Sequence, residues 1–129
     1  MNYFQPNDLN SALDVLQNNS DLTIAAGCTD LFPITNNMSL DKNILDITNI
    51  KSIKGFQFNS KETKIGSATT WTDIINENLP SCYDMLKACA KEVGSIQIQN
   101  LGTIGGNICN ASPACLLYTS DAADDANCV

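Results

Sequence analysis

The sequence contains no histidine and no arginine, and all seven of its basic residues are lysines. Its six cysteines include no C-x-x-C pair, so neither a tetrahedral zinc site nor an iron–sulfur cluster is expected. The net charge of -7 disfavours binding to nucleic acid or to an anionic membrane, which requires a basic surface. We therefore expect no metal site, no nucleic-acid partner and no membrane partner.

Long apolar runs and secretion signals are missing as well. No stretch is long enough to span a bilayer, and the N-terminus MNYFQPND lacks the basic and apolar regions of a signal peptide. These features predict a cytoplasmic protein whose cysteines stay reduced. With 129 residues, 43% of them hydrophobic and 16% charged, the chain has the composition of one modest globular domain.

The first half of the sequence predicts a β-α-β arrangement followed by further strands. Residues 7–19, NDLNSALDVLQNN, have leucines at helical spacing and Asn7 or Asp8 as the N-cap. Runs typical of short strands are YFQP, LTIAAG and NILDIT, and the pair IKGFQFN and TKIGSA predicts a hairpin across SKE. The predicted fold class is therefore α+β, or mixed α/β.

Two helices are predicted in the second half. One begins after Thr70 and ends before Pro80, and the next begins at Ser81 as its N-cap and ends before Gly94. The alternation of isoleucines at positions 96 and 98 is typical of a strand.

Two glycine-containing stretches have residue types that suit an anion. The first, IAAGCTDL, follows a strand to Gly27 and offers backbone amides and the Thr29 hydroxyl, which suit a pyrophosphate. The second, GTIGGN, pairs Gly105 with Gly106, which permits close approach of a ligand, but it matches neither the dinucleotide fingerprint nor the P-loop. Each stretch alone is also typical of an ordinary turn, the first before a helix capped by Thr29 or Asp30, the second between strands.

Taken together, the motifs YFQP…SALDVL, AAGCTDLFP, ILDIT, IGSATTWTDI and VGSIQIQNLGTIGGNICNASPA have the order and spacing of a known family. Residues 1–114 resemble the FAD-binding, or medium, subunit of molybdenum hydroxylases, as in xanthine dehydrogenase and carbon monoxide dehydrogenase. The resemblance implies the N-terminal part of a PCMH-type FAD-binding domain, with the fold of vanillyl-alcohol oxidase-type flavoproteins. The sequence departs from the family at Cys28, where glycine is commoner, and at Gln99, where many relatives carry arginine.

The resemblance also implies that backbone amides of both stretches clasp the FAD pyrophosphate. The cofactor-binding residues that it carries over are Ile24, Ala25, Ala26, Gly27, Cys28, Thr29, Asp30 and Leu31 in the first stretch and Thr103, Ile104, Gly105, Gly106 and Asn107 in the second. Val93 and Ile98 match apolar positions beside the flavin or adenine, and Asn110 and Ser112 lie in the small-residue segment next to the cofactor. No catalytic acid or base is expected, because the redox chemistry belongs to the flavin.

The implied function is that of an electron-transferring oxidoreductase subunit. In the family, electrons pass from a molybdopterin-binding large subunit through the [2Fe–2S] clusters of a small subunit to FAD and then to an acceptor. Two other interpretations stay open: a flavin-fold module that binds or regulates without redox work, and a small anion-binding α+β protein without flavin.

The residues after Ala114 depart from the family pattern. The segment CLLYTSDAADDANCV lacks lysine and isoleucine, and it resembles the translation of a transposase-type sequencing adapter. Residues 115–129 are therefore predicted to be a non-native tail, and a divergent helix capped by Ser120 is the alternative. Because the family's domain continues past this point, we expect a truncated domain that is inactive alone.

Overall fold

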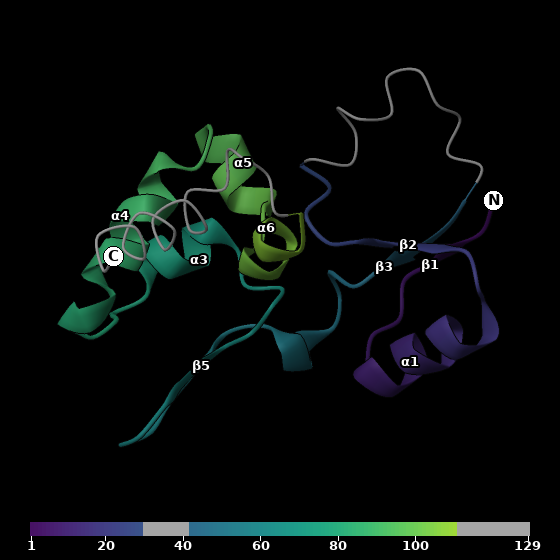
Figure 1. Cartoon of the computed structure of the whole chain (residues 1–129), viewed down its shortest axis with the longest axis horizontal. Coiled ribbons are helices and arrows are strands. Elements are labelled where there is room, and N and C mark those ends of the chain that lie inside the picture. Colours follow the sequence, from purple (N-terminus) through teal and green to yellow (C-terminus); the bar gives the residue numbers. More distant parts are fainter. Residues whose placement is uncertain (30–41, 111–129) are drawn as a thin grey trace, which may run out of the picture.

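A computed structural model describes residues 1–29 and 42–110 of the chain. Its N-terminal region is a three-stranded sheet of β1 (Tyr3–Phe4), β2 (Leu22–Ala25) and β3 (Asn43–Asp46), with α1 (Leu9–Asn18) against it (Figure 1). The strand order is β1-β3-β2, and β3 pairs in parallel with both neighbours. The predicted β-α-β arrangement is thus confirmed, and the carboxyl ends of all three strands lie at one edge of the sheet.

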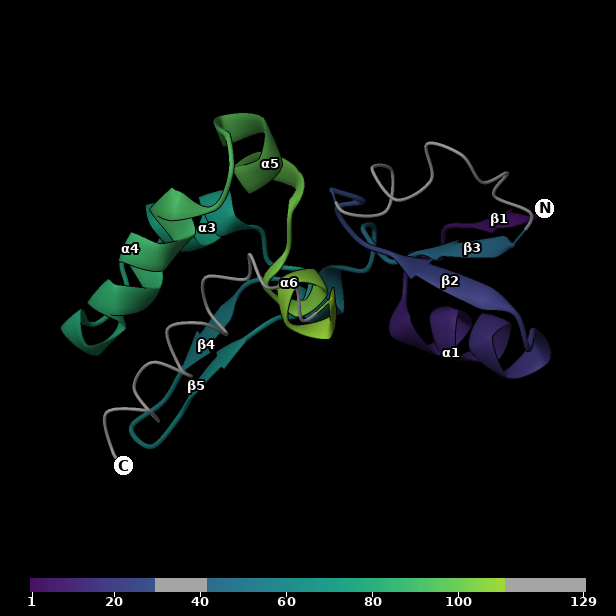
Figure 2. The same ribbon diagram turned by 45° about the horizontal axis from the view of Figure 1, so that its top comes forward.

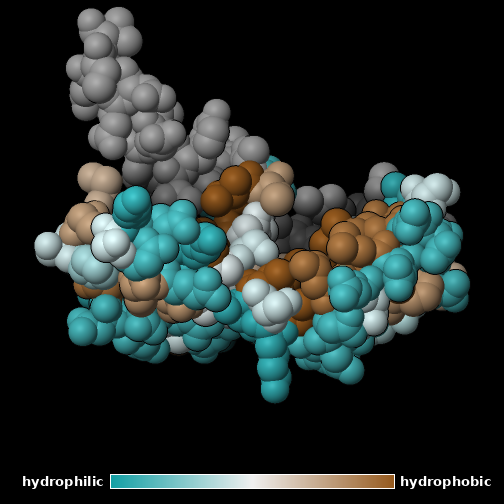
Figure 3. Space-filling view, turned by 90° about the horizontal axis from the view of Figure 1, so that it is seen from below, coloured by the Kyte–Doolittle hydropathy of each residue, from teal (hydrophilic) through white to brown (hydrophobic). Residues whose placement is uncertain are grey.

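Helix α1 begins and ends where the sequence predicts. The Asp8 side chain accepts a hydrogen bond from the Ser11 backbone N–H at 2.9 Å, and the helix ends at Asn18. Only Ala12 on its apolar face is buried, whereas the leucines at positions 9, 13 and 16 are exposed. Figure 3, which views the molecule from below, shows hydrophobic residues gathered on the side where α1 lies.

The second region contains a hairpin and a cluster of helices. The hairpin consists of β4 (Phe56–Phe58) and β5 (Thr63–Ile65), which pair antiparallel as predicted. It follows the 3-10 helix η1 (Lys51–Ile53) and projects away from the helices (Figure 2). Thr69 ties the base of the hairpin to the helices, because its fully buried side chain accepts the Gly55 N–H at 2.9 Å.

The helical cluster packs around the only tryptophan of the chain. Its elements are α3 (Trp71–Asn76), the 3-10 helix η2 (Ser81–Tyr83), α4 (Asp84–Glu92), α5 (Ile96–Leu101) and α6 (Ile104–Asn110). Trp71, Ile74, Leu79 and Ala90 form its buried core. Burial of these side chains supplies the main stabilisation of this region. Among the described helices, none is long and apolar enough to cross a membrane.

Helix boundaries in this region confirm two predictions and overturn two. Thr70 caps α3 in a reciprocal capping box, and Gly94 follows the end of α4 with a φ of 48°. Ser81 does not cap α4, because it lies in η2 and α4 begins after Tyr83. The strand predicted from the isoleucines at 96 and 98 is wrong: Ser95 caps α5, and its hydroxyl accepts the backbone N–H of residue 98.

We expect Asp8→Ala to lower the free energy of unfolding by about 1 kcal/mol, because the first turn of α1 loses its side-chain acceptor. Urea unfolding measures this loss. Asp14→Ala, at an exposed position inside the same helix, is the matched control and should leave stability unchanged or slightly higher. Equal stability of the two variants would contradict the assigned cap.

Candidate functional site

The two glycine-containing stretches, far apart in the sequence, lie in direct contact. A Cβ atom added at Gly27 would lie 1.8 Å from the Leu101 carbonyl oxygen, so no side chain fits between the two backbones. A Cβ atom added at Gly102 would lie 3.6 Å from the Thr29 hydroxyl. The structure therefore brings together the two segments that the sequence singled out.

The second stretch is anchored to the segment that leads into α3. The Trp71 N–H donates to the Gly102 carbonyl at 3.1 Å, and the Ile104 N–H donates to the Thr69 carbonyl at 3.0 Å. The Gly105 N–H donates to the Ser67 carbonyl at 2.9 Å. A Cβ atom at Gly105 would lie 2.6 Å from that carbonyl oxygen, so this glycine is required by close packing.

The interpretation of GTIGGN as a turn between strands is wrong, because Gly105 and Gly106 lie in the first turn of α6. The Thr103 hydroxyl accepts the Gly106 N–H at 3.1 Å, and the Thr103 carbonyl accepts the Asn107 N–H at 3.0 Å. Thr103 is only 5% exposed. The backbone N–H groups of residues 104–107 are thus all used inside the protein, so these four residues offer a ligand no backbone hydrogen-bond donor.

Cys28 in the first stretch adopts a φ of 58°, in the left-handed region that favours glycine. Glycine would adopt this geometry without strain. Burial and the nearby charge of Asp46 raise the pKa of the Cys28 thiol, so the thiol is neutral at physiological pH. Its sulfur lies 3.8 Å from the Ala26 carbonyl oxygen, to which it donates a weak hydrogen bond.

Asp46, at the end of β3 beside the first stretch, links the ends of β1 and β3 by hydrogen bonds. Its carboxylate accepts hydrogen bonds from the Thr48 N–H at 2.8 Å, the Thr48 hydroxyl at 2.6 Å, the Gln5 amide at 3.0 Å and the Tyr3 hydroxyl. Burial acts to raise the pKa of Asp46, but these hydrogen bonds outweigh it and lower the pKa below its ordinary value. The next residue, Ile47, donates its N–H to the Ala25 carbonyl at 2.9 Å and so fixes the start of the stretch.

A cavity of about 680 Å³ lies along the junction of the two stretches. The predicted site residues that line it are Ile24, Ala25, Ala26, Gly27, Cys28, Thr29, Val93, Ile98, Thr103, Gly105, Gly106, Asn107 and Asn110. Ile104 does not line it and packs instead against the core around Trp71. Asp30, Leu31 and Ser112 lie outside the described residues.

Sequence reasoning did not assign six further lining residues to the site. They are Ile47, Ser67, Trp71, Gly94, Gly102 and Cys109. Ser67 and Trp71 lie in the motif IGSATTWTDI, which contributed to the family resemblance and was the available signal. Gln99 is not among the lining residues, because its amide donates to the Lys91 carbonyl at the end of α4 at 3.0 Å.

No charged side chain is found among the described residues that line this cavity. Hydroxyl and amide groups occupy part of the wall, and Trp71, Val93 and Ile98 supply apolar surface. In residues 1–29 and 42–110, no three histidine, cysteine, aspartate or glutamate side chains are grouped to hold a metal ion. The site therefore suits a ligand with both an apolar part and oxygen acceptors.

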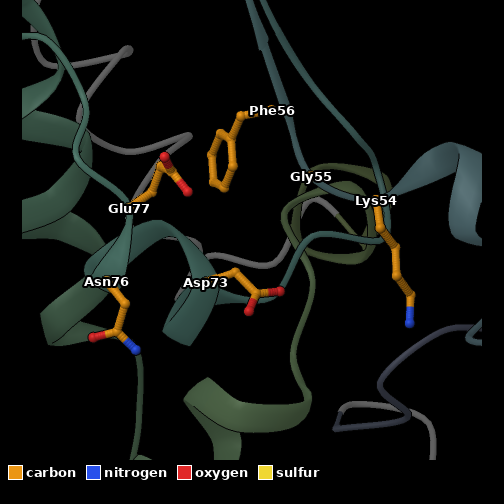
Figure 4. Close-up of a pocket in the computed structure, with 6 residues that line it drawn as sticks. All are labelled: Lys54, Gly55, Phe56, Asp73, Asn76 and Glu77. Carbon is orange, nitrogen blue, oxygen red and sulfur yellow. The ribbon is translucent and has the colours of Figure 1, made fainter.

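A second, smaller pocket of about 390 Å³ lies between the start of β4 and α3, lined by Lys54, Gly55, Phe56, Asp73, Asn76 and Glu77 (Figure 4). The Asp73 carboxylate accepts the Thr70 N–H at 3.2 Å as part of the α3 capping box. The Lys54 side chain points away from both carboxylates in Figure 4. The Asp73 carboxylate in this pocket therefore has a structural role as part of the α3 cap.

A preformed cavity between two glycine-containing stretches, with neutral donors on its wall, is the kind of site that holds a nucleotide cofactor. The family model described as the FAD binding domain in molybdopterin dehydrogenase matches residues 1–128. The chain belongs to this family, and the resemblance inferred from its motifs is confirmed.

Individual relatives agree with this assignment. The xanthine dehydrogenase FAD-binding subunit of Escherichia coli O157:H7 is 32% identical over 113 residues, which are 85% of this chain and 39% of the relative. The nicotinate dehydrogenase FAD-subunit of Eubacterium barkeri is 35% identical over 118 residues, 87% of this chain and 39% of the relative. The chain thus spans about two fifths of the length of these relatives.

A solved structure supports the fold. Carbon monoxide dehydrogenase from Hydrogenophaga pseudoflava, in the form that lacks the Mo-pyranopterin moiety of the molybdenum cofactor, superposes with a TM-score of 0.75 and 27% identity. The match covers 84% of this chain and 39% of that chain. The predicted fold class, a mixed α/β N-terminal portion of the family's FAD-binding domain, is confirmed.

We expect Gly27→Ala to lower the free energy of unfolding by about 2–3 kcal/mol, because the new methyl group must push the Leu101 backbone away. Chemical unfolding followed by Trp71 fluorescence measures the loss. Cys28→Gly, at the next position, is the matched control and should be tolerated, because glycine adopts the left-handed conformation without strain. A Gly27→Ala protein as stable as the control would contradict the close contact.

Asp46→Asn is expected to lower the melting temperature near neutral pH, because the hydrogen bonds lose their charged acceptor. The pKa of Asp46 in the folded state lies below its ordinary value of 3.8, so its stabilisation is present above 3.8 and is lost as pH falls through the lowered value. The gap between wild type and variant should therefore shrink on acidification. Melting curves over a pH series test this, with Asp14→Asn as the exposed control; a gap independent of pH would contradict it.

Proposed function

We propose that this protein binds FAD non-covalently and belongs to the electron-transferring FAD subunit of a molybdenum hydroxylase. The observation that carries the proposal is the contact of the Gly27 and Gly102 backbones along a cavity of about 680 Å³, in a chain of this family. The names of the relatives, which are FAD-binding subunits of dehydrogenases, support it.

The residues of the cavity fit the chemistry of this cofactor. The backbone N–H groups of the first stretch, residues 27–29, make no hydrogen bond within the described residues, so they are available to a diphosphate. Residues 104–107 of the second stretch use their N–H groups internally, and the stretch would instead offer the side chains of Thr103 and Asn107. Val93 and Ile98 would shield the ring system of the cofactor from water.

In the proposed role, FAD accepts electrons and passes them on, and that redox chemistry is supplied by the cofactor. The chain's part is to bind and orient it and to exclude water. No acid or base of the described site is assigned to the reaction. The proposed partners are a [2Fe–2S] small subunit as electron donor and a molybdopterin-binding large subunit that oxidises the substrate.

Three predictions from the sequence remain open, and the first is the role of each predicted cofactor-binding residue. The cytoplasmic location stays a prediction. The assignment of residues 1–114 to the family's domain and of 115–129 to a non-native tail also stays a prediction, because residues 111–129 lie outside the described part of the chain.

Purification of the protein in the longest form that its gene encodes should yield visible flavin absorbance, and denaturation should release all of the flavin into the supernatant. Adding FAD to the cofactor-free protein should quench the fluorescence of Trp71, the only tryptophan, because its side chain lines the cavity. Absence of both signals would contradict the proposed function. Flavin that stays attached to denatured protein would contradict non-covalent binding.

A further inference from the structure

The turn at residues 66–69 contains Ser67, a cavity-lining residue that lies outside the two glycine-containing stretches. The Thr69 N–H donates to the Gly66 carbonyl at 3.0 Å, which closes the turn with Ser67 at its second position. The Ala68 N–H donates to the Ile53 carbonyl at 2.9 Å, and the side chains of Ala68 and Thr69 are buried. The backbone of Ser67 is therefore held in place from its C-terminal side.

Ser67 itself lies on the cavity wall and is exposed there. Its carbonyl oxygen accepts the Gly105 N–H, and a Cβ atom added at Gly105 would lie 2.8 Å from the Ser67 Cβ. This packing places the serine side chain beside the glycines of the second stretch. Within residues 1–29 and 42–110, its hydroxyl makes no hydrogen bond.

Residues 104–107 of the second stretch have no free backbone donor, which makes this hydroxyl significant. The N–H groups of residues 104–107 are all used inside the protein, and Thr103 is buried with its hydroxyl accepting one of them. An anionic group that lies beside residues 104–107 therefore depends on side-chain donors. Ser67 supplies one on a rigid turn, so little conformational entropy is lost when a ligand binds.

We propose that Ser67 is a ligand-binding residue of this cavity, whose Oγ–H donates a hydrogen bond to a phosphoryl oxygen of the FAD diphosphate. This inference rests on the proposed function. The competing explanation is that serine occupies the position only because it favours turns, in which case its hydroxyl is dispensable for binding.

Ser67→Ala removes the hydroxyl and preserves the turn. We expect it to weaken FAD binding about tenfold in a Trp71 fluorescence titration, with an unchanged melting temperature. Adenosine diphosphate, which carries the diphosphate without the flavin, should weaken by a similar factor when it competes with FAD. Ser60→Ala, in the exposed turn of the hairpin, is the matched control and should bind both ligands as the wild type does.

Wild-type affinity of Ser67→Ala for both ligands would overturn this inference and leave the proposed function intact. A wild-type protein that does not bind FAD would overturn both. Should Ser67→Ala lower the melting temperature, Ser67→Cys repeats the comparison with a side chain of similar size and a weak donor. Weaker binding by that variant supports the inference, and equal binding overturns it.

Discussion

The rest of the site depends on the contact of Gly27 with the Leu101 carbonyl, into which no side chain fits. It joins the carboxyl edge of the parallel sheet to the helical region through bare backbone. From there the Gly102 carbonyl accepts the Trp71 N–H, so the junction continues directly into the buried core around that tryptophan. The two walls of the cavity, drawn from distant parts of the sequence, are thereby held at a fixed separation, as a preformed ligand site requires.

Features set by a few neighbouring residues were predictable from the sequence. Asp8 and Thr70 cap their helices because a side-chain oxygen reaches an N–H three residues ahead, an interaction that needs no tertiary structure. Gly94 follows the end of α4 with a positive φ, a conformation that glycine adopts without steric cost. The meeting of the two glycine stretches was different in kind. It followed from the order and spacing of several motifs, because neither stretch alone distinguishes a ligand loop from a turn.

The errors arose where a local helix cap was not recognised and where tertiary contacts override local preference. Two isoleucines at alternate positions are too few to tell a strand from a helix, and the cap at Ser95 decides for a helix. Paired glycines disfavour a helix, yet Gly105 and Gly106 lie in the first turn of α6, which Thr103 caps. Glycine is needed at position 105 because Ser67 packs too closely for a Cβ atom. The motif IGSATTWTDI contains Ser67, but its place on the cavity wall was not assigned from the sequence because it depends on this backbone contact.

The absence of charge from the described cavity wall determines how an anionic ligand is held. The chain has a net charge of -7, so long-range attraction does not favour a diphosphate, and no described lining residue offers an ion pair. Asp46, near Cys28, adds negative charge close to the first stretch, but its carboxylate is covered by hydrogen bonds from Tyr3, Gln5 and Thr48. Binding must then come from neutral donors held at the correct spacing. A backbone that moved slightly would lose several hydrogen bonds together, because no strong charge compensates for misplacement. The bare contact at Gly27 thus contributes to binding by holding the neutral donors at their spacing.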